Sequence, residues 1–232
     1  MNILISNDDG WGSPGIRILE KIARRLGNVW VVAPAAPMSG ISHQMTFEVP
    51  MSLEEREPQS FTLSGTPADC TRVAMSQLDV DFDWVLSGVN HGANLGADMA
   101  VSGTVAAVRE AGFLGFRGIA FSQYLDGMRS PFEWHLTEEI LDRLLPKLLA
   151  NPIEPGQWVN VNFPDTQGQP VQEIKFVKTV PDRNPLPSNY KQIDENKIIY
   201  CGKYKDRDCD AGSDADVCFG GGVSITHHQH WM

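Results

Sequence analysis

The sequence lacks the features that would place the protein in a membrane or on a nucleic acid. It has no run of roughly 18 apolar residues, as a transmembrane helix would need. Its start, MNILISNDDG, has no basic segment and too short an apolar stretch for a signal peptide. Positive charge is scarce, because 19 Lys and Arg face 29 Asp and Glu and leave a formal net charge of −10. An acidic protein repels polyanions, so we exclude a nucleic-acid-coating role. The missing apolar run excludes membrane insertion.

Cysteine is also sparse, and no two cysteines form a C-x-x-C pair, so a zinc knuckle or a redox motif is not indicated. We expect four reduced thiols and a cytoplasmic protein. The composition is otherwise that of a globular domain, with 42% hydrophobic and 21% charged residues. A length of 232 residues suits one domain over residues 1–232. The cysteines are Cys70, Cys201, Cys209 and Cys218.

The first 34 residues predict a strand, a helix and a second strand. Residues 2–6 are a short apolar run, suited to a buried parallel strand. Pro14 follows Ser13, a plausible N-cap, and apolar residues then recur at helical spacing until Gly27 closes the helix. Residues 28–33 are the second strand. This unit indicates a right-handed parallel crossover.

The rest of the first 165 residues continues the alternation and predicts a doubly wound, mostly parallel, Rossmann-like α/β core. After residue 165 the helical period is lost, and we expect a β-rich extension over 166–232 that packs on the core. The predicted helices are 67–78, 104–111 and 131–149. The predicted strands are 83–87, 118–122 and 158–162 in the core, with short segments near 171–180, 196–204 and 222–226 in the extension.

Residues 45–64 have no helical period, and we predict that they form a β-hairpin arm standing off the sheet. Apolar residues alternate along its first half, at Met45, Phe47, Val49, Met51 and Leu53. An isolated hairpin is marginal in water, and an exposed apolar strip usually marks an interface. We therefore expect at least a homodimer.

Three polar clusters follow predicted strands, at Asn7–Gly10, Met38–Gly40 and Ser87–Asn90. Ligands bind beyond the carboxyl ends of strands in open parallel sheets, so these clusters predict a shared site. Asp8 and Asp9 are like charges that repel unless a cation lies between or beside them. Mg²⁺ or Mn²⁺ prefers oxygen ligands, and Ser39 and Asn90 offer neutral ones.

The stretch from Gly88 to Thr104 is rich in glycine and ends in Ser102-Gly103-Thr104, which opens a helix. Backbone N–H groups in such a loop and at a helix N-terminus favour an anion, although neither the Walker A pattern nor G-x-G-x-x-G is present. His43 and His91 lie in these loops and could contact phosphate or protonate a leaving group. The histidines at 227, 228 and 230 suggest a frayed terminus.

Linked motifs in one order resemble the survival protein SurE family, whose members are 5′/3′-nucleotidases. They are ISNDDG at 5–10, VVAP at 31–34 with Ser39-Gly40 after it, GTPADC at 65–70, SGVNHGANLG at 87–96, SGTVAAVREAG at 102–112 and VSIT at 223–226. The resemblance covers nearly the whole chain and implies an α/β core with a protruding hairpin.

The resemblance also implies the site and the assembly. One divalent cation would be held by Asp8, Asp9, Ser39 and Asn90, with Asp8 and Asp9 as the catalytic residues. The phosphate would be bound by Asn94, Ser102, Gly103 and Thr104. The family forms dimers and tetramers, and some members act on polyphosphate. The ending HHQHWM is shorter than the usual tail, which favours a dimer over a tetramer here, and the family is variable at His43 and His91.

The sequence therefore predicts metal-assisted hydrolysis of nucleoside monophosphates, with Asp8 as base, nucleophile or ligand. Three rival interpretations fit less well. A haloacid-dehalogenase-type phosphatase needs D-x-D, whereas these acids are adjacent. A receiver domain needs an Asp after a central strand, where Ser87-Gly88 stands. A Rossmann-type binding module would carry G-x-G-x-x-G after its first strand.

Overall fold

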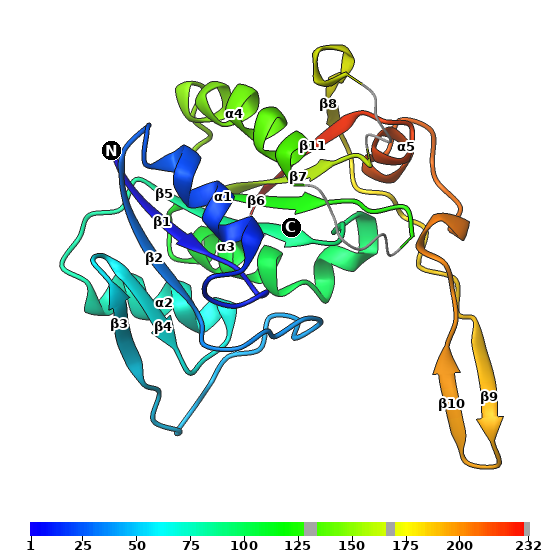
Figure 1. Cartoon of the computed structure of the whole chain (residues 1–232), viewed down its shortest axis with the longest axis horizontal. Helices are drawn as coiled ribbons and strands as arrows, with labels where there is room; N and C mark the ends of the chain where they lie inside the picture. Colours follow the sequence, from blue (N-terminus) through cyan, green and yellow to red (C-terminus); the bar gives the residue numbers. More distant parts are fainter. Residues whose placement is uncertain (128–133, 166–169, 230–232) are drawn as a thin grey trace.

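The computed structural model of the protein describes residues 1–127, 134–165 and 170–229. Within these ranges, nine strands form one sheet in the order β3-β4-β2-β1-β5-β6-β7-β11-β8, with helices on both faces (Figure 1). All neighbours from β4 to β7 are parallel, as predicted for a doubly wound α/β protein. The strands are β1 (Asn2–Ser6), β2 (Asn28–Pro34), β3 (Leu53–Glu57), β4 (Ser60–Leu63), β5 (Trp84–His91), β6 (Arg117–Gln123), β7 (Gln157–Phe163), β8 (Phe176–Thr179) and β11 (Val223–Gln229).

Two hydrophobic cores lie on opposite faces of this sheet, because successive side chains of a strand point to opposite sides. Ile3 and Ile5 of β1 join the core under α1 and α4, whereas Leu4 joins the core under α2 and α3. The helices are α1 (Pro14–Ala23), α2 (Pro67–Gln77), α3 (Gly103–Phe113) and α4 (His135–Ala150). The sequence did not predict four short helices. Three are 3-10 helices, η1 (Gly96–Ala100), η2 (Val171–Glu173) and η3 (Tyr204–Asp206), and the fourth is the α-helix α5 (Asp214–Phe219).

Several predicted boundaries shift for reasons of packing. α1 ends at Ala23, and Gly27 serves a different purpose, since a Cβ there would lie 2.5 Å from the carbonyl oxygen of Met1. The Ser13 hydroxyl does not cap α1 but accepts a hydrogen bond from Asn7 Nδ2 at 2.8 Å. β5 continues past Ser87 to His91, so the glycine-rich loop begins later than predicted.

The prediction of an arm at residues 45–64 is wrong in place and extent. β3 and β4 do form a hairpin, but β4 pairs in parallel with β2 and makes the hairpin the edge of the main sheet. Residues 45–52 contain no strand. The alternating pattern misled because Met51 and Leu53 pack on the core beside α2, whereas Phe47 and Val49 are exposed.

A different hairpin protrudes from the molecule. β9 (Tyr190–Asp194) and β10 (Lys197–Tyr200) pair only with each other among the described strands and extend away from the body (Figure 1). Their exposed residues are largely apolar, namely Tyr190, Ile193, Ile198, Ile199 and Tyr200. The protruding hairpin implied by the resemblance is therefore present, but it lies in the segment that was expected to form the extension.

The extension contributes to the central sheet instead of packing on it. β11 lies between β7 and β8, antiparallel to the first and parallel to the second. His227 and His228 are part of this strand, so the expected fraying does not apply to them. The His228 ring stacks on Trp158 at 4.0 Å between ring centroids, and burial lowers its pKa to about 4. His230 and residues 131–133 of the predicted fourth helix lie outside the described residues.

All four cysteines are free thiols, as expected. None of the helices in the described ranges combines the length and apolarity that crossing a membrane requires.

The start of α2 holds the segment that follows β2 in place through hydrogen bonds. Thr66 and Asp69 form a capping box at the start of the helix, and Asp69 is almost fully buried. The Asp69 carboxylate also accepts hydrogen bonds from the backbone N–H and the hydroxyl of Thr46.

We predict that Asp69→Ala lowers the free energy of unfolding by about 3 kcal/mol, because several buried donors lose their acceptor. Urea unfolding measures this change. Ser76→Ala, on the exposed side of α2, is the matched control, and an equal loss in both variants would contradict the prediction.

Candidate active site

Asp8 and Asp9 lie at the carboxyl end of β1, near the middle of the sheet. The turn that carries them is held by Asn7, whose side-chain nitrogen donates to the carbonyl oxygen of Gly10 at 3.0 Å. Asp8 is 4% exposed, whereas Asp9 is partly exposed. The two adjacent carboxylates thus sit at different depths of one site, where the sequence analysis expected a ligand.

The carboxylate of Asp8 packs directly against the start of α3. The Thr104 hydroxyl donates a hydrogen bond to Asp8 Oδ1. A Cβ on Gly103 would lie 2.8 Å from the Asp8 Cβ, so only glycine allows this approach. Burial raises the pKa of Asp8 to about 6, against the lowering effect of Thr104, and the neighbouring Asp9 raises it further. The helix N-terminus therefore offsets only part of the cost of burying this charge.

Asp9 links β1 to β5. Its Oδ2 accepts a hydrogen bond from the backbone N–H of His91 at 3.1 Å. Burial raises the pKa of Asp9 as well, with a partial offset from His91. Asn90, the residue before His91, donates its side-chain N–H to the carbonyl oxygen of Gly92 at 2.7 Å, which leaves its side-chain oxygen as a donor atom for a cation. The structure thus brings Asn90 next to the aspartate pair.

Ser39 lies in the exposed part of a loop that runs past Asp8. The preceding residue, Met38, donates its backbone N–H to the carbonyl oxygen of Asp8 at 2.7 Å. Further along, Ser42 donates its backbone N–H to the carbonyl oxygen of Val101 at 2.9 Å. Ser39 therefore lies between two points at which its loop is fastened, one at Asp8 and one just before α3.

Asn94 lies one strand further along the same edge. Its side-chain nitrogen donates to Ser122 Oγ at 2.8 Å, and Ser122 is in register with Asn90. Its backbone N–H donates to Asn162 Oδ1, and its carbonyl oxygen accepts from the side chains of Asn160 and Asn162. This buried network fixes the position of the loop, and the predicted contact of Asn94 with phosphate stays a prediction.

The two hydroxyl groups predicted to contact phosphate have different partners within the protein. Ser102 caps α3 by accepting from the backbone N–H of Val105 at 3.1 Å, whereas the Thr104 hydroxyl donates to Asp8. The Ser102 hydroxyl therefore keeps its proton for an anion at the start of α3, and the Thr104 hydroxyl does not. The glycine at 103 leaves the approach to the backbone there open.

The two loop histidines differ. His43 has both ring nitrogens bonded, to Glu110 Oε2 and to Arg109 Nε, each at 2.8 Å. It is therefore part of a buried network and does not face an incoming phosphate. His91 is exposed, and its ring lies beside that of Trp134 with 6.0 Å between centroids.

The residues present fit a divalent cation. Among the described residues, neither Asp8 nor Asp9 pairs with a lysine or an arginine, and burial raises the pKa of both. A metal site made of three or more His, Cys, Asp or Glu side chains is absent from those ranges. The candidate donors are thus two carboxylates and neutral oxygens, a set that suits Mg²⁺ or Mn²⁺ better than zinc.

A cavity of about 760 Å³ opens beside this site. It is bounded by the ends of β5 and β6 and by η3 with the two residues before it, and its lining combines two tyrosines and a leucine with charged side chains. Its lining residues are His91, Gly92, Tyr124, Leu125, Asp126, Gly127 and 202–206. Since His91 touches Asp9 through its backbone, the cavity adjoins the predicted cation site.

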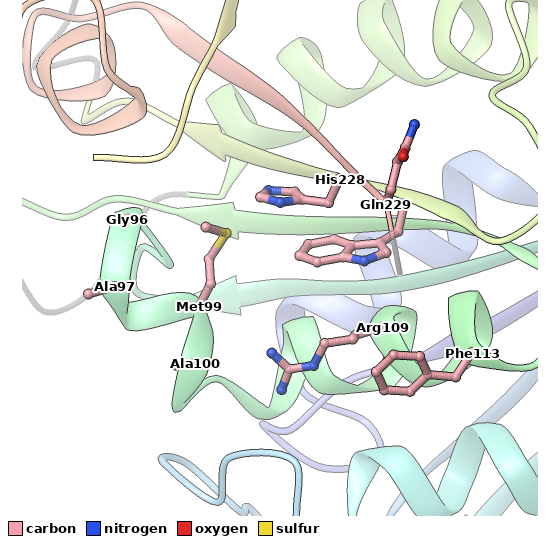
Figure 2. Close-up of a pocket in the computed structure, with 9 residues that line it drawn as sticks. Gly96, Ala97, Met99, Ala100, Arg109, Phe113, His228 and Gln229 are labelled. Carbon is pink, nitrogen blue, oxygen red and sulfur yellow. The ribbon is translucent and has the colours of Figure 1, made fainter. Parts of the chain in front are cut away.

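A second cavity, of about 330 Å³, lies beside the C-terminal half of α3. Figure 2 shows Arg109 and Phe113 of α3 on one side of it and His228 and Gln229 of β11 on the other. None of the residues predicted for the cation or the phosphate lines this cavity.

Some residues of the site were missed in the sequence. Asn160 and Asn162 support Asn94, and their alternation in the otherwise apolar β7 was a usable signal, because buried polar residues need partners. Glu110, 2% exposed on α3, gave no signal, since its partners come from residues 43 and 72.

Comparison with known proteins identifies a family and a solved structure that this chain resembles. The family model described as survival protein SurE matches residues 3–184. A curated relative from Nostoc sp. is 43% identical over 227 residues, covering 97% of this chain and 98% of the relative. The 5′-nucleotidase SurE of Methylobacterium nodulans is 43% identical over 181 residues, covering 76% and 72%. The crystal structure of the SurE protein from Aquifex aeolicus superposes with a TM-score of 0.85 at 31% identity, covering 99% of this chain and 94% of that one.

We predict that Asp8→Asn stabilises the metal-free protein at pH 7.5. The folded-state pKa of Asp8 is about 6, above the ordinary value of 3.8, so its ionisation costs stability as pH rises from about 4 to 6 and the cost is complete above that. The variant should gain on the order of 1–3 kcal/mol at pH 7.5 and almost nothing at pH 4. Thermal unfolding with EDTA at the two pH values tests this. Asp142→Asn, on the surface of α4, should show no such pH dependence, and a pH-independent effect of Asp8→Asn would contradict the prediction.

Proposed function

Because this chain belongs to the survival protein SurE family, we propose that it is a metal-dependent phosphoric monoester hydrolase that converts nucleoside 5′-monophosphates to nucleoside and phosphate. The observation that carries the proposal is the pair Asp8–Asp9 at the end of β1, of which Asp8 is buried and Asp9 is partly exposed, and neither pairs with a lysine or an arginine among the described residues. Names of relatives such as the 5′-nucleotidase SurE of Methylobacterium nodulans support the activity.

The proposed ligands of one divalent cation, Mg²⁺ or Mn²⁺, are Asp8, Asp9, Ser39 and Asn90. All four lie on segments that meet at the carboxyl edge of the sheet. When bound, such a cation neutralises charge on phosphoryl oxygens and makes a water molecule more acidic.

The chain itself orients the phosphate. Gly103 and Thr104 are proposed for the phosphate because they lie at the positive end of the α3 dipole, where the Gly103 N–H offers a hydrogen bond and the Thr104 backbone holds Asp8. Ser102 and Asn94 keep this backbone and its neighbouring loop in place through their hydrogen bonds, and both belong to the proposed phosphate-binding set. The Thr104 hydroxyl favours the ionised form of Asp8, which is the form needed for a ligand, base or nucleophile.

The cavity of about 760 Å³ beside His91 supports a nucleoside as the leaving group. Its volume lies within the range of small-molecule sites, and its tyrosines suit a base while its polar side chains suit a sugar. Nucleoside 3′-monophosphates and short polyphosphates are proposed as further substrates, since the cavity is open and the reacting phosphate is held separately.

For assembly we propose a homodimer in the cytoplasm, with the tetramer as the alternative. The hairpin β9–β10 replaces residues 45–64 as the contact element. It exposes apolar side chains on both of its faces and, in the described structure, packs against no other strand. Two such hairpins would cover one another's apolar residues.

We predict that Asp8→Asn and Asp9→Asn each lower kcat at least a hundredfold with adenosine 5′-monophosphate and Mn²⁺. Each change removes a charge from the proposed cation site at nearly constant volume. Release of inorganic phosphate measures the rate, and EDTA should abolish the wild-type activity until Mn²⁺ is restored. Asp142→Asn serves as the control. Full activity of Asp8→Asn at saturating substrate would refute the assignment.

We also predict that Ile198→Lys, on β10, raises the dimer dissociation constant at least tenfold. Ile198 is 69% exposed, and a charge there would have to be buried in the proposed contact. Sedimentation equilibrium at micromolar protein measures the change, with Ile198→Leu as the conservative control. A wild-type protein that sediments as a monomer would show that the hairpin is not an interface.

A further inference from the structure

The Ser39 loop, which we define as residues 35–46, has no regular structure and yet is fastened along its length. Besides the bonds of Met38 and Ser42 already described, the Ser42 hydroxyl donates to the carbonyl oxygen of Ala100 at 2.8 Å. Ile41 packs at the start of α3, close to Gly103. Ser42 holds a left-handed φ of 60°, which a residue other than glycine adopts only when its surroundings impose it.

His43 makes a side-chain connection between this loop and the body of α3. Its Nδ1 accepts a hydrogen bond from Arg109 Nε, so the ring proton is on Nε2, which donates to Glu110 Oε2. The ring also lies beside Phe113, with 5.6 Å between centroids. Arg109 and Phe113 therefore contact the His43 ring, and the same two side chains also line the small cavity of Figure 2.

Glu110 is the buried acceptor at the centre of this connection. One of its carboxylate oxygens bonds His43 and the other bonds Arg72 of α2. Burial alone would raise its pKa, but the hydrogen bonds from His43 and Arg72 outweigh burial and lower the pKa. Glu110 is thus an ionised, fully paired anchor. It lies about two helical turns from Gly103 on the same rigid helix that positions Asp8.

We propose that His43 and Glu110 are positioning residues that set the place of Ser39 relative to Asp8. The start of α3 fixes Asp8, and the body of the same helix fixes the Ser39 loop through His43. One helix therefore determines the spacing between two proposed ligands that come from different strands. This inference rests on the proposed function, because it takes Ser39 and Asp8 as ligands of one cation.

The geometry rules out a direct chemical role for His43. Both of its ring nitrogens are bonded within the protein, so neither is free to contact substrate. Groups behind a metal ligand typically change metal affinity or activity tenfold to a hundredfold when they are removed. A positioning role therefore predicts an effect of that size that depends on the presence of Ser39.

A double-mutant cycle tests this dependence. We expect His43→Ala and Ser39→Ala each to raise the Mn²⁺ dissociation constant about tenfold, as measured by calorimetry. The double variant should bind only as weakly as Ser39→Ala alone, within about threefold, because His43 acts through the Ser39 loop. Hydrogen exchange of residues 38–44 should be faster in His43→Ala. Ser76→Ala, on the exposed side of α2 and outside this network, is the matched control and should leave Mn²⁺ affinity within about twofold.

The outcomes separate this inference from the proposed function. Wild-type protein that neither binds Mn²⁺ nor hydrolyses nucleotide would refute the proposed function itself. Wild-type binding with unchanged affinity in His43→Ala would refute only the positioning role. Unchanged affinity in Ser39→Ala would remove Ser39 from the proposed ligands and the positioning role with it. Equal and additive losses in the two variants would show that His43 stabilises the fold generally. His43→Gln, which retains a donor toward Glu110, provides the second variant and should recover part of the affinity if His43→Ala folds poorly.

Discussion

The burial of the Asp8 carboxylate at the start of α3 is the constraint on which the site depends. A buried carboxylate has a raised pKa, and here the hydroxyl and backbone of Thr104 and the backbone of Asp8 offset part of the cost. Because Gly103 has no side chain, the helix can approach closely enough to provide that offset. The neighbouring segments with Asp9, Asn90 and Ser39 are then arranged around this negative charge, where the proposed cation would bind.

The sequence predicted local structure well and distant pairing poorly. The unit β1–α1–β2 and the helix α2 depend on residues within a few positions of one another, so their patterns were readable. The pairing of β4 with β2 depends on residues about 30 positions apart, and the alternation over residues 45–53 suggested an arm instead. β11 likewise could be recognised as a strand, but its place between β7 and β8 could not.

The candidate site shows the same division. Position after a strand was enough to bring Asp8, Asp9 and Asn90 together, since the carboxyl ends of parallel strands share one edge. The use of the Thr104 hydroxyl by Asp8 was not predictable, because it joins two loops that are 96 residues apart. Glu110 was missed because a single carboxylate in a helix looks like a surface residue until its partners are known.

The place of β11 has a consequence for the order in which the protein is made. Synthesis proceeds from the N-terminus, so β7 and β8 leave the ribosome before their shared partner exists. During that interval β7 presents an open edge of unpaired N–H and C=O groups, the kind of edge to which other chains add. The nascent sheet therefore cannot close on that side until residues 223–229 have emerged, and this makes the interval the step of biogenesis most exposed to aggregation.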